Sequence, residues 1–235
     1  MSLEDRLAAT EALLHAIAAR HQRVVLANSY GAEDMVLTDI VARLGLPFAT
    51  FSLDTGRLPA ETYALMQEVG SRYPVLPVRV YYPDTAATEA YVNTHGINGF
   101  YQSVEARKAC CQVRKIEPLR RALAGQDAWL TGLRREQSPT RQDLGAEAYD
   151  TDNGLMKYNP LIDWTETDVW AYIRRHGVPY NALHDRHYPS IGCSPCTRAI
   201  AVGEDVRAGR WWWENPDTKE CGLHVQASPL KRPAA

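Results

Sequence analysis

Short apolar runs and amphipathic stretches alternate along roughly the first 180 residues of the chain. Buried strands of a parallel sheet are near-continuous apolar runs, and a crossover, usually a helix, separates each from the next. The alternation therefore predicts an α/β fold with a mostly parallel sheet flanked by helices. The predicted strands cover 23–29, 47–56, 74–82, 128–132 and 157–164, and the predicted helices cover 3–20, 33–45, 59–72, 84–95, 103–123 and 165–177.

Two of the predicted helices carry local signals for where they bend, begin or end. Pro118 lies within 103–123, and we expect a kink or break there, because a proline removes a helical hydrogen bond and crowds the preceding turn. Thr165 and Asp168 match a capping box at the start of 165–177, and Gly177 suits the left-handed residue that ends a helix.

The regular pattern does not continue to the C-terminus. After about residue 185 the periodicity disappears, and the sequence becomes rich in Pro, Gly and Trp. A length of 235 residues suits one large domain, or one domain with an appendage. We therefore expect residues 1–185 to form the α/β domain, and residues 186–235 to form an irregular C-terminal segment that is not an independent domain.

Charge and hydropathy argue against several classes of partner. With 26 basic and 28 acidic residues, the formal net charge is −2, which argues against a nucleic-acid partner. No window approaches the ~18 uninterrupted apolar residues of a membrane span, and the N-terminus lacks the basic and then apolar regions of a signal peptide. We expect a cytoplasmic protein with no nucleic-acid or membrane partner, and a homo-oligomer is compatible with the sequence.

Three polar turns follow predicted strands: SYGAED (29–34), LDTGR (53–57) and TGLRRE (131–136). Ligands of open α/β sheets bind at the carboxyl ends of the strands, and backbone N–H groups at a helix N-terminus can hold an anion. The first turn lacks the ending of a Walker A motif. Arginine suits phosphate and sulfate, so Arg134, Arg135 and Arg141 indicate an anion clamp, with a solvated charged face as the alternative.

The cysteines form two close pairs and one single residue. Cys110 and Cys111 are adjacent, whereas Cys193 and Cys196 form a CxxC motif. A vicinal disulfide is strained, and cytosolic proteins seldom carry structural disulfides. Four thiolates could hold zinc or an iron–sulfur cluster. We favour a cluster, because adjacent thiolates fit poorly around one small ion but can bind separate iron atoms.

Cys221 stands apart from these pairs, in the motif KECGLH near the C-terminus. Lys219 and His224 would favour its thiolate form, which is the nucleophilic form of cysteine. It is either a nucleophile or an exposed thiol without a role. A thiol near a chain terminus could visit both a substrate pocket and a redox partner.

Eight motifs together closely resemble the assimilatory adenylyl-sulfate (APS) reductases: SYGAED, LDTGRL, KACCQVRK, TGLRREQSPTR, KYNPL, IGCSPCTR, GRWWWE and KECGLH. These enzymes belong with the phosphoadenylyl-sulfate (PAPS) reductases, on the adenine-nucleotide α-hydrolase-like fold. The resemblance runs from about residue 22 to residue 224, and the combination of CC, CxxC and ECGLH is highly specific.

The resemblance implies an activity, a cofactor and an electron donor. The enzyme would reduce adenosine 5′-phosphosulfate to sulfite and AMP, in sulfate assimilation and cysteine biosynthesis. Cys221 would attack the sulfate sulfur, and thioredoxin or glutaredoxin would then release sulfite from the S-sulfocysteine. A [4Fe–4S] cluster would be held by the four paired cysteines, Cys110, Cys111, Cys193 and Cys196.

The resemblance also assigns residues around the substrate. Lys115 would lie between the cluster and the substrate, and the sulfate would meet Arg207, Arg210 and His224. Tyr30 replaces a phenylalanine that is usual in relatives, and we expect its ring to stack near the nucleotide. The substrate-binding residues would be Ser29, Tyr30, Gly31, Leu53, Asp54, Thr55, Gly132, Arg134 and Arg141.

Three alternatives stay open at this point. The first is a PAPS reductase or an enzyme that uses both nucleotides, although loss of the four cluster cysteines usually accompanies PAPS use in the family. The second is an ATP pyrophosphatase or adenylating ligase, which would need an SGGxDS-type loop that SYGAED does not match. The third is a non-enzymatic metal-thiolate redox sensor or zinc-binding regulator.

Overall fold

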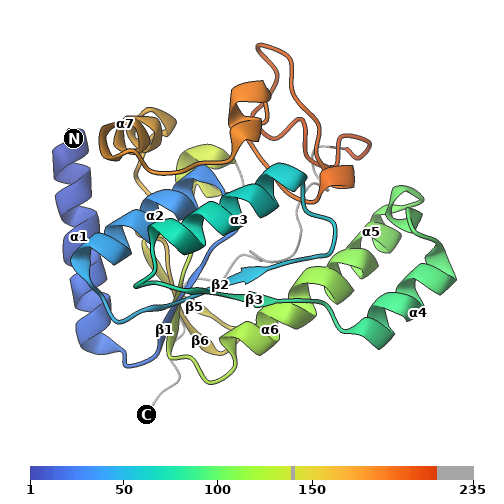
Figure 1. The fold of residues 1–235 in the computed structure, drawn as a ribbon, viewed down its shortest axis with the longest axis horizontal. Coiled ribbons are helices and arrows are strands. Elements are labelled where there is room, and N and C mark those ends of the chain that lie inside the picture. The colour runs from blue at the N-terminus through green and yellow to red at the C-terminus, as the bar shows by residue number, and fades with distance from the viewer. Residues whose placement is uncertain (139–140, 216–235) are drawn as a thin grey trace.

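The computed structural model describes residues 1–138 and 141–215 (Figure 1). Within them lies a six-stranded sheet of order β3-β2-β1-β4-β6-β5, in which only the β5–β6 pair is antiparallel. The strands are β1 (Val24–Ala27), β2 (Ala49–Leu53), β3 (Val78–Tyr81), β4 (Ala128–Leu130), β5 (Glu147–Asp150) and β6 (Leu155–Tyr158). The expected α/β class is confirmed. The strand order reverses direction at β1, so the crevice between β1 and β4 is where this architecture binds ligands.

Helices cover both faces of the sheet (Figure 1). On one face, apolar side chains of α1 (Leu3–Arg20), α2 (Ala32–Leu44), α3 (Ala60–Arg72) and α7 (Glu166–His176) form the larger core with β1, β4 and β6. On the other face, α6 (Glu117–Leu123) packs on the opposite side of the same strands. The remaining helices are α4 (Thr85–His95) and α5 (Val104–Cys111). None of the described helices is both long and apolar enough to cross a membrane.

The structure differs from the prediction in two places. The segment 103–123 is not one helix: a π-helical turn, Gln112–Ile116, separates α5 from α6. Pro118 is the second residue of α6, where a missing N–H costs little, so the break precedes the proline. The edge strand β5 was missed, because its sequence EAYD has no apolar run and its residues alternate between exposed and half-buried.

Other local predictions hold. The first four predicted strands appear as β1 to β4, each shorter than its apolar run, and the fifth appears as β6, which begins and ends earlier than 157–164. Helix α7 begins with the expected capping box, in which the Thr165 hydroxyl accepts a hydrogen bond from the Asp168 N–H. It ends at Gly177, which has a left-handed backbone with φ of 59°.

Candidate functional site

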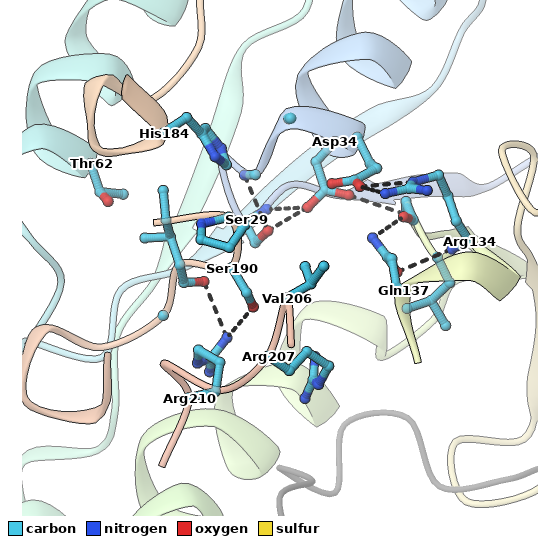
Figure 2. Close-up of a pocket in the computed structure, with 18 of the residues that line it drawn as sticks. Ser29, Asp34, Thr62, Arg134, Gln137, His184, Ser190, Val206, Arg207 and Arg210 are labelled. Carbon is cyan, nitrogen blue, oxygen red and sulfur yellow. Dashed lines mark hydrogen bonds and ion pairs between the residues drawn. The ribbon is translucent and has the colours of Figure 1, made fainter. Parts of the chain in front are cut away.

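A cavity of about 760 Å³ opens at the carboxyl ends of β1, β2 and β4. The loops that follow these strands form one side, and parts of the C-terminal segment between 187 and 211 form the other (Figure 2). Ten of the predicted substrate-binding and catalytic residues line it: Ser29, Gly31, Leu53, Thr55, Lys115, Gly132, Arg134, Arg141, Arg207 and Arg210. The polar turns that the sequence placed at strand ends therefore do meet around one space.

Asp34 ties the loop after β1 to the loop after β4. Its carboxylate accepts hydrogen bonds from the Ser29 N–H at 2.8 Å, the Ser29 hydroxyl at 2.5 Å and the Gly132 N–H at 3.0 Å. A Cβ at position 132 would collide with this carboxylate, so glycine is required there. Burial raises the pKa of Asp34 from 3.8 to about 6.

Two residues expected at the substrate do not line the cavity. Tyr30 has a left-handed backbone with φ of 62°, and its ring is buried in the larger core and does not line the cavity; its stacking on a nucleotide stays a prediction. Asp54 instead holds the turn after β2: one of its carboxylate oxygens accepts from the Gly56 N–H at 2.7 Å and from the Tyr63 hydroxyl at 2.9 Å.

The three arginines after β4 do not form a single clamp. Arg134 is buried, and its guanidinium pairs with Glu33 at 2.8 Å and Glu136 at 3.1 Å, which offsets its charge. Arg135 pairs with Asp163 on the surface and does not line the cavity. Arg141 is buried and lines the cavity, where its guanidinium donates to the Gln137 side chain. The prediction is thus corrected for Arg135.

Further cationic side chains of the cavity lie on the C-terminal segment and the π-helical turn. In Figure 2, Arg207 and Arg210 lie below Ser29 in the view. The Arg210 guanidinium is buried, lies 4.6 Å from the Trp211 ring centroid and donates to the Ile191 carbonyl at 3.3 Å. Lys115 approaches from the π-helical turn, a local geometry that is frequent at functional sites.

A second, much smaller cavity of about 20 Å³ is lined by all four paired cysteines. Cys110 is half-buried, and the other three are buried. Five basic side chains also line it: Arg57, Arg107, Arg114, Lys115 and Arg210. The two cavities share a wall, because Lys115, Cys193, Arg210 and Trp211 line both.

The surroundings of the cysteines suit a negatively charged metal–thiolate group. Burial raises the pKa of Cys196 to about 12. The Thr55 hydroxyl lies 3.2 Å from the Cys193 sulfur, within hydrogen-bond distance. In the described part of the chain, no three His, Cys, Asp or Glu side chains are placed to hold one metal ion. The four cysteines nevertheless line one small cavity together with basic side chains.

Two predicted residues cannot be placed, and one residue of the cavity was not predicted. Cys221 and His224 lie outside the described residues. His184 was not singled out by the sequence, yet it lines the large cavity and packs 5.2 Å from Trp170, between ring centroids. Burial lowers its pKa, which favours a neutral imidazole. Only its position just before the cysteine motif could have drawn attention to it.

Comparison with known proteins gives a consistent result. The family model for the phosphoadenosine phosphosulfate reductase domain matches residues 23–199. Adenosine 5′-phosphosulfate reductases are similar over nearly the whole chain: that of Allochromatium vinosum is 58% identical, covering 100% of this chain and 91% of the relative. That of Burkholderia cepacia is 56% identical, covering 92% and 86%, and that of Neisseria meningitidis serogroup B is 50% identical, covering 95% and 91%.

Solved structures support the same fold. A phosphoadenylyl-sulfate reductase from Candida auris, in a phosphate complex, has a TM-score of 0.70 and 26% identity, covering 82% of this chain and 90% of that one. An FMN adenylyltransferase from Candida glabrata, in complex with FMN and an ATP analogue, has a TM-score of 0.56 and 14% identity, covering 97% and 77%. The second likeness concerns the fold alone.

Proposed function

Since the chain belongs to the phosphoadenosine phosphosulfate reductase family, and adenosine 5′-phosphosulfate reductases match nearly all of it at 50–58% identity, we propose that it reduces adenosine 5′-phosphosulfate in sulfate assimilation. In the proposed reaction, thioredoxin or glutaredoxin supplies the electrons, and sulfite and AMP are the products. Cys221 carries the sulfur between the two half-reactions as an S-sulfocysteine.

The observation that carries this proposal is the wall between the two cavities. A space large enough for a nucleotide and a cavity lined by four cysteines share Lys115 and Arg210, two cations. Arg207 is a further cationic side chain of the large cavity. Such an arrangement suits an anionic substrate whose sulfate end lies towards the cysteines.

The same four cysteines are the proposed ligands of a [4Fe–4S] cluster: Cys110, Cys111, Cys193 and Cys196. Their thiol donors, their placement around one small cavity and the five basic side chains beside it support this choice. When bound, the cluster would contribute a fixed electrostatic field, because both electrons of the reaction come from the dithiol donor. Because its ligands come from α5 and from the C-terminal segment, the cluster would also hold these two parts of the chain together.

In the first half-reaction, the Cys221 thiolate attacks the sulfate sulfur. A sulfur–sulfur bond forms, the bond from sulfur to the bridging phosphate oxygen breaks, and AMP leaves. Nucleophile and substrate are both anions, so cations must offset their repulsion. Lys115, Arg207 and Arg210 line the large cavity, which supports this role for them.

In the second half-reaction, a thiolate of the donor attacks the Cys221 sulfur and releases sulfite. The second thiol of the donor then resolves the mixed disulfide and regenerates the Cys221 thiol. The donor dithiol is oxidised to a disulfide by two electrons, which balances the reduction of sulfate to sulfite. Cys221 must therefore meet the substrate first and a protein partner second.

An anaerobic preparation tests the proposal directly. The protein is assayed for iron and sulfide, and then for sulfite release from adenosine 5′-phosphosulfate with reduced thioredoxin or glutaredoxin, with the 3′-phosphorylated nucleotide at equal concentration as a parallel arm. We expect iron, sulfide and faster release from the nucleotide without the 3′-phosphate. Sulfite release only from the 3′-phosphorylated substrate, or none from either, would contradict the proposed function and favour a PAPS reductase or a redox sensor.

The proposed nucleophile has its own test. Without a donor, wild-type protein mixed with substrate should gain one SO₃ on the peptide that contains Cys221, as measured by mass spectrometry. Cys221→Ser should gain none and release no sulfite, because a serine hydroxyl has no thiolate fraction at neutral pH. Its iron content and nucleotide binding should persist, since other residues line both cavities. Sulfite from Cys221→Ser would overturn the mechanism.

A further inference from the structure

The chain leaves the described part of the molecule through residues 211–215, which have no regular secondary structure. Aromatic contacts hold this stretch: the Trp213 ring lies 4.4 Å from that of Tyr101, between centroids. One backbone hydrogen bond, from the Trp211 N–H to the Cys196 carbonyl at 3.1 Å, links it to the CxxC motif. Its charged residue, Glu214, precedes Cys221 by seven positions in the sequence.

Glu214 forms a two-pronged ion pair with Arg107 of α5. The guanidinium Nε donates to Oε1 at 2.9 Å, and one terminal nitrogen donates to Oε2 at 2.8 Å. The side chains are only 1% and 3% exposed, and no other ion pair among the described residues has both partners so deeply buried. Burying two charges costs desolvation energy, so such a pair is weak evidence for stability and is better attested as a device that fixes geometry.

Arg107 is itself held by a second contact. Its guanidinium lies 4.9 Å from the Trp211 ring centroid. Helix α5 carries Cys111, so Glu214 is held at a fixed place beside the cysteine cavity. Trp211 also lines the large cavity, so the same contacts define where the chain leaves relative to the substrate.

We infer that Arg107 and Glu214 are a positioning pair that anchors the root of the segment carrying Cys221. Seven residues span at most about 25 Å when fully extended, so the anchor sets an upper limit on how far the thiol can lie from Glu214. Confinement raises the effective concentration of a nucleophile at its target. The inference rests on the proposed role of Cys221. The pair serves the attack on substrate, whereas release of sulfite, which happens at the partner, does not need it.

The informative variant is Glu214→Gln. Glutamine keeps the volume and one acceptor but removes the charge that grips the guanidinium. Arg107 is left unchanged, because it also contacts the Trp211 ring. Glu214→Asp keeps the charge and shortens the side chain, so it should have a smaller effect. Glu204→Gln is the matched control, since its pair with Arg198 lies in the same segment but is 41% and 35% exposed.

The two half-reactions are measured separately in the anaerobic holoprotein. Rapid quenching and mass spectrometry give the rate at which the SO₃ adduct forms on Cys221 in a single turnover. The isolated adduct is then mixed with reduced thioredoxin, and the rate of sulfite release is recorded. For Glu214→Gln we expect adduct formation to slow by roughly ten- to a hundredfold, as misplaced reactants do, with sulfite release, iron content and nucleotide affinity within about twofold of wild type. Glu204→Gln should match wild type throughout.

Other outcomes overturn the inference. An unchanged rate of adduct formation in Glu214→Gln would show that the pair does not position the thiol. Loss of iron or of nucleotide binding, or an equal slowing of both half-reactions, would show a general structural role. If wild type itself forms no adduct on Cys221, the proposed function fails and this inference fails with it, which is a distinct result.

Discussion

The sheet with its helices and the C-terminal segment after residue 185 are held together in different ways. In the former, buried apolar side chains from four helices and the strands form a continuous core. In the latter, the buried cluster consists of Phe100, Cys193, Cys196 and Trp211. Much of its remaining attachment is polar, as in the hydrogen bond from the Ser194 N–H to the Arg57 carbonyl at 2.8 Å.

Because of this difference, we expect the two regions to respond differently to substitutions. An apolar core tolerates changes that conserve volume, because many weak contacts share the energy. A segment attached by single hydrogen bonds, cation–π contacts and one buried ion pair depends on each of them. Arg207, Arg210, Cys193 and Cys196 come from that segment, so the chemistry of the site should be more sensitive to substitution than the fold.

The largest expected effect is the loss of the proposed cluster in Cys193→Ser. A hydroxyl is a poor ligand for iron here, and Cys193 lies in the wall between the two cavities. We expect iron and sulfide contents to fall sharply and sulfite release to be lost, whereas the regular secondary structure persists by circular dichroism. Cys221→Ser, which should keep its iron, is the control. A Cys193→Ser protein with full iron and full rate would refute the ligand assignment.

The next effect concerns the cations of the large cavity. Under the proposed function, Arg207→Ala and Arg210→Ala would each remove a charge-assisted contact to the sulfate or phosphate, worth about 1.5–3 kcal/mol. We expect kcat/KM to fall by roughly ten- to a hundredfold in either variant. Arg198→Ala is the control, because Arg198 belongs to the same segment, pairs with Glu204 and does not line the cavity. Normal kcat/KM in both cavity variants would mean that these arginines do not meet the substrate.

The sequence predicted the buried strands and the chemically distinctive site residues better than the polar edge strand. Apolar runs located β1 to β4, since burial on both faces of a parallel sheet demands such runs. The polar edge strand β5 carries no such pattern and was missed. The loops and cysteine pairs were found because their residue types are chemically distinctive.

Contacts between distant residues were beyond the reach of sequence patterns. The bond from the Gly132 N–H to Asp34 joins residues 98 apart, and the pair of Arg107 with Glu214 joins residues 107 apart. The direction of the Tyr30 ring depends on its left-handed backbone, which no local pattern signalled. Periodicity and motifs describe neighbours along the chain, whereas these features depend on which loops the tertiary fold brings together.

A moderate effect on KM should appear with pH, because Asp34 shapes the loop after β1. Burial raises the pKa of Asp34 from 3.8 to about 6, so its contribution to stability is fully present below pH 3.8 and is lost as the pH rises through 6. The ionised form nevertheless accepts the bonds that shape the loop. We expect the KM for substrate to rise several-fold as the pH falls below about 6. In Asp34→Asn, KM should be raised at all pH values without that inflection, and an inflection that persists would exclude Asp34 as its source.

The smallest effect on activity should come from a substitution in the apolar core between the sheet and its helices. Ile40 lies in α2 with its side chain fully buried in the larger cluster, and it does not line either cavity. Ile40→Val removes one methylene, which typically lowers the free energy of unfolding by about 0.5–1.5 kcal/mol. Urea denaturation would measure that loss, and kcat/KM should stay within about twofold of wild type, because the protein remains almost entirely folded under assay conditions. A large drop in kcat/KM without a matching loss of stability would show that packing between the sheet and its helices sets the geometry of the site. The proposed contrast between the two regions would then be wrong.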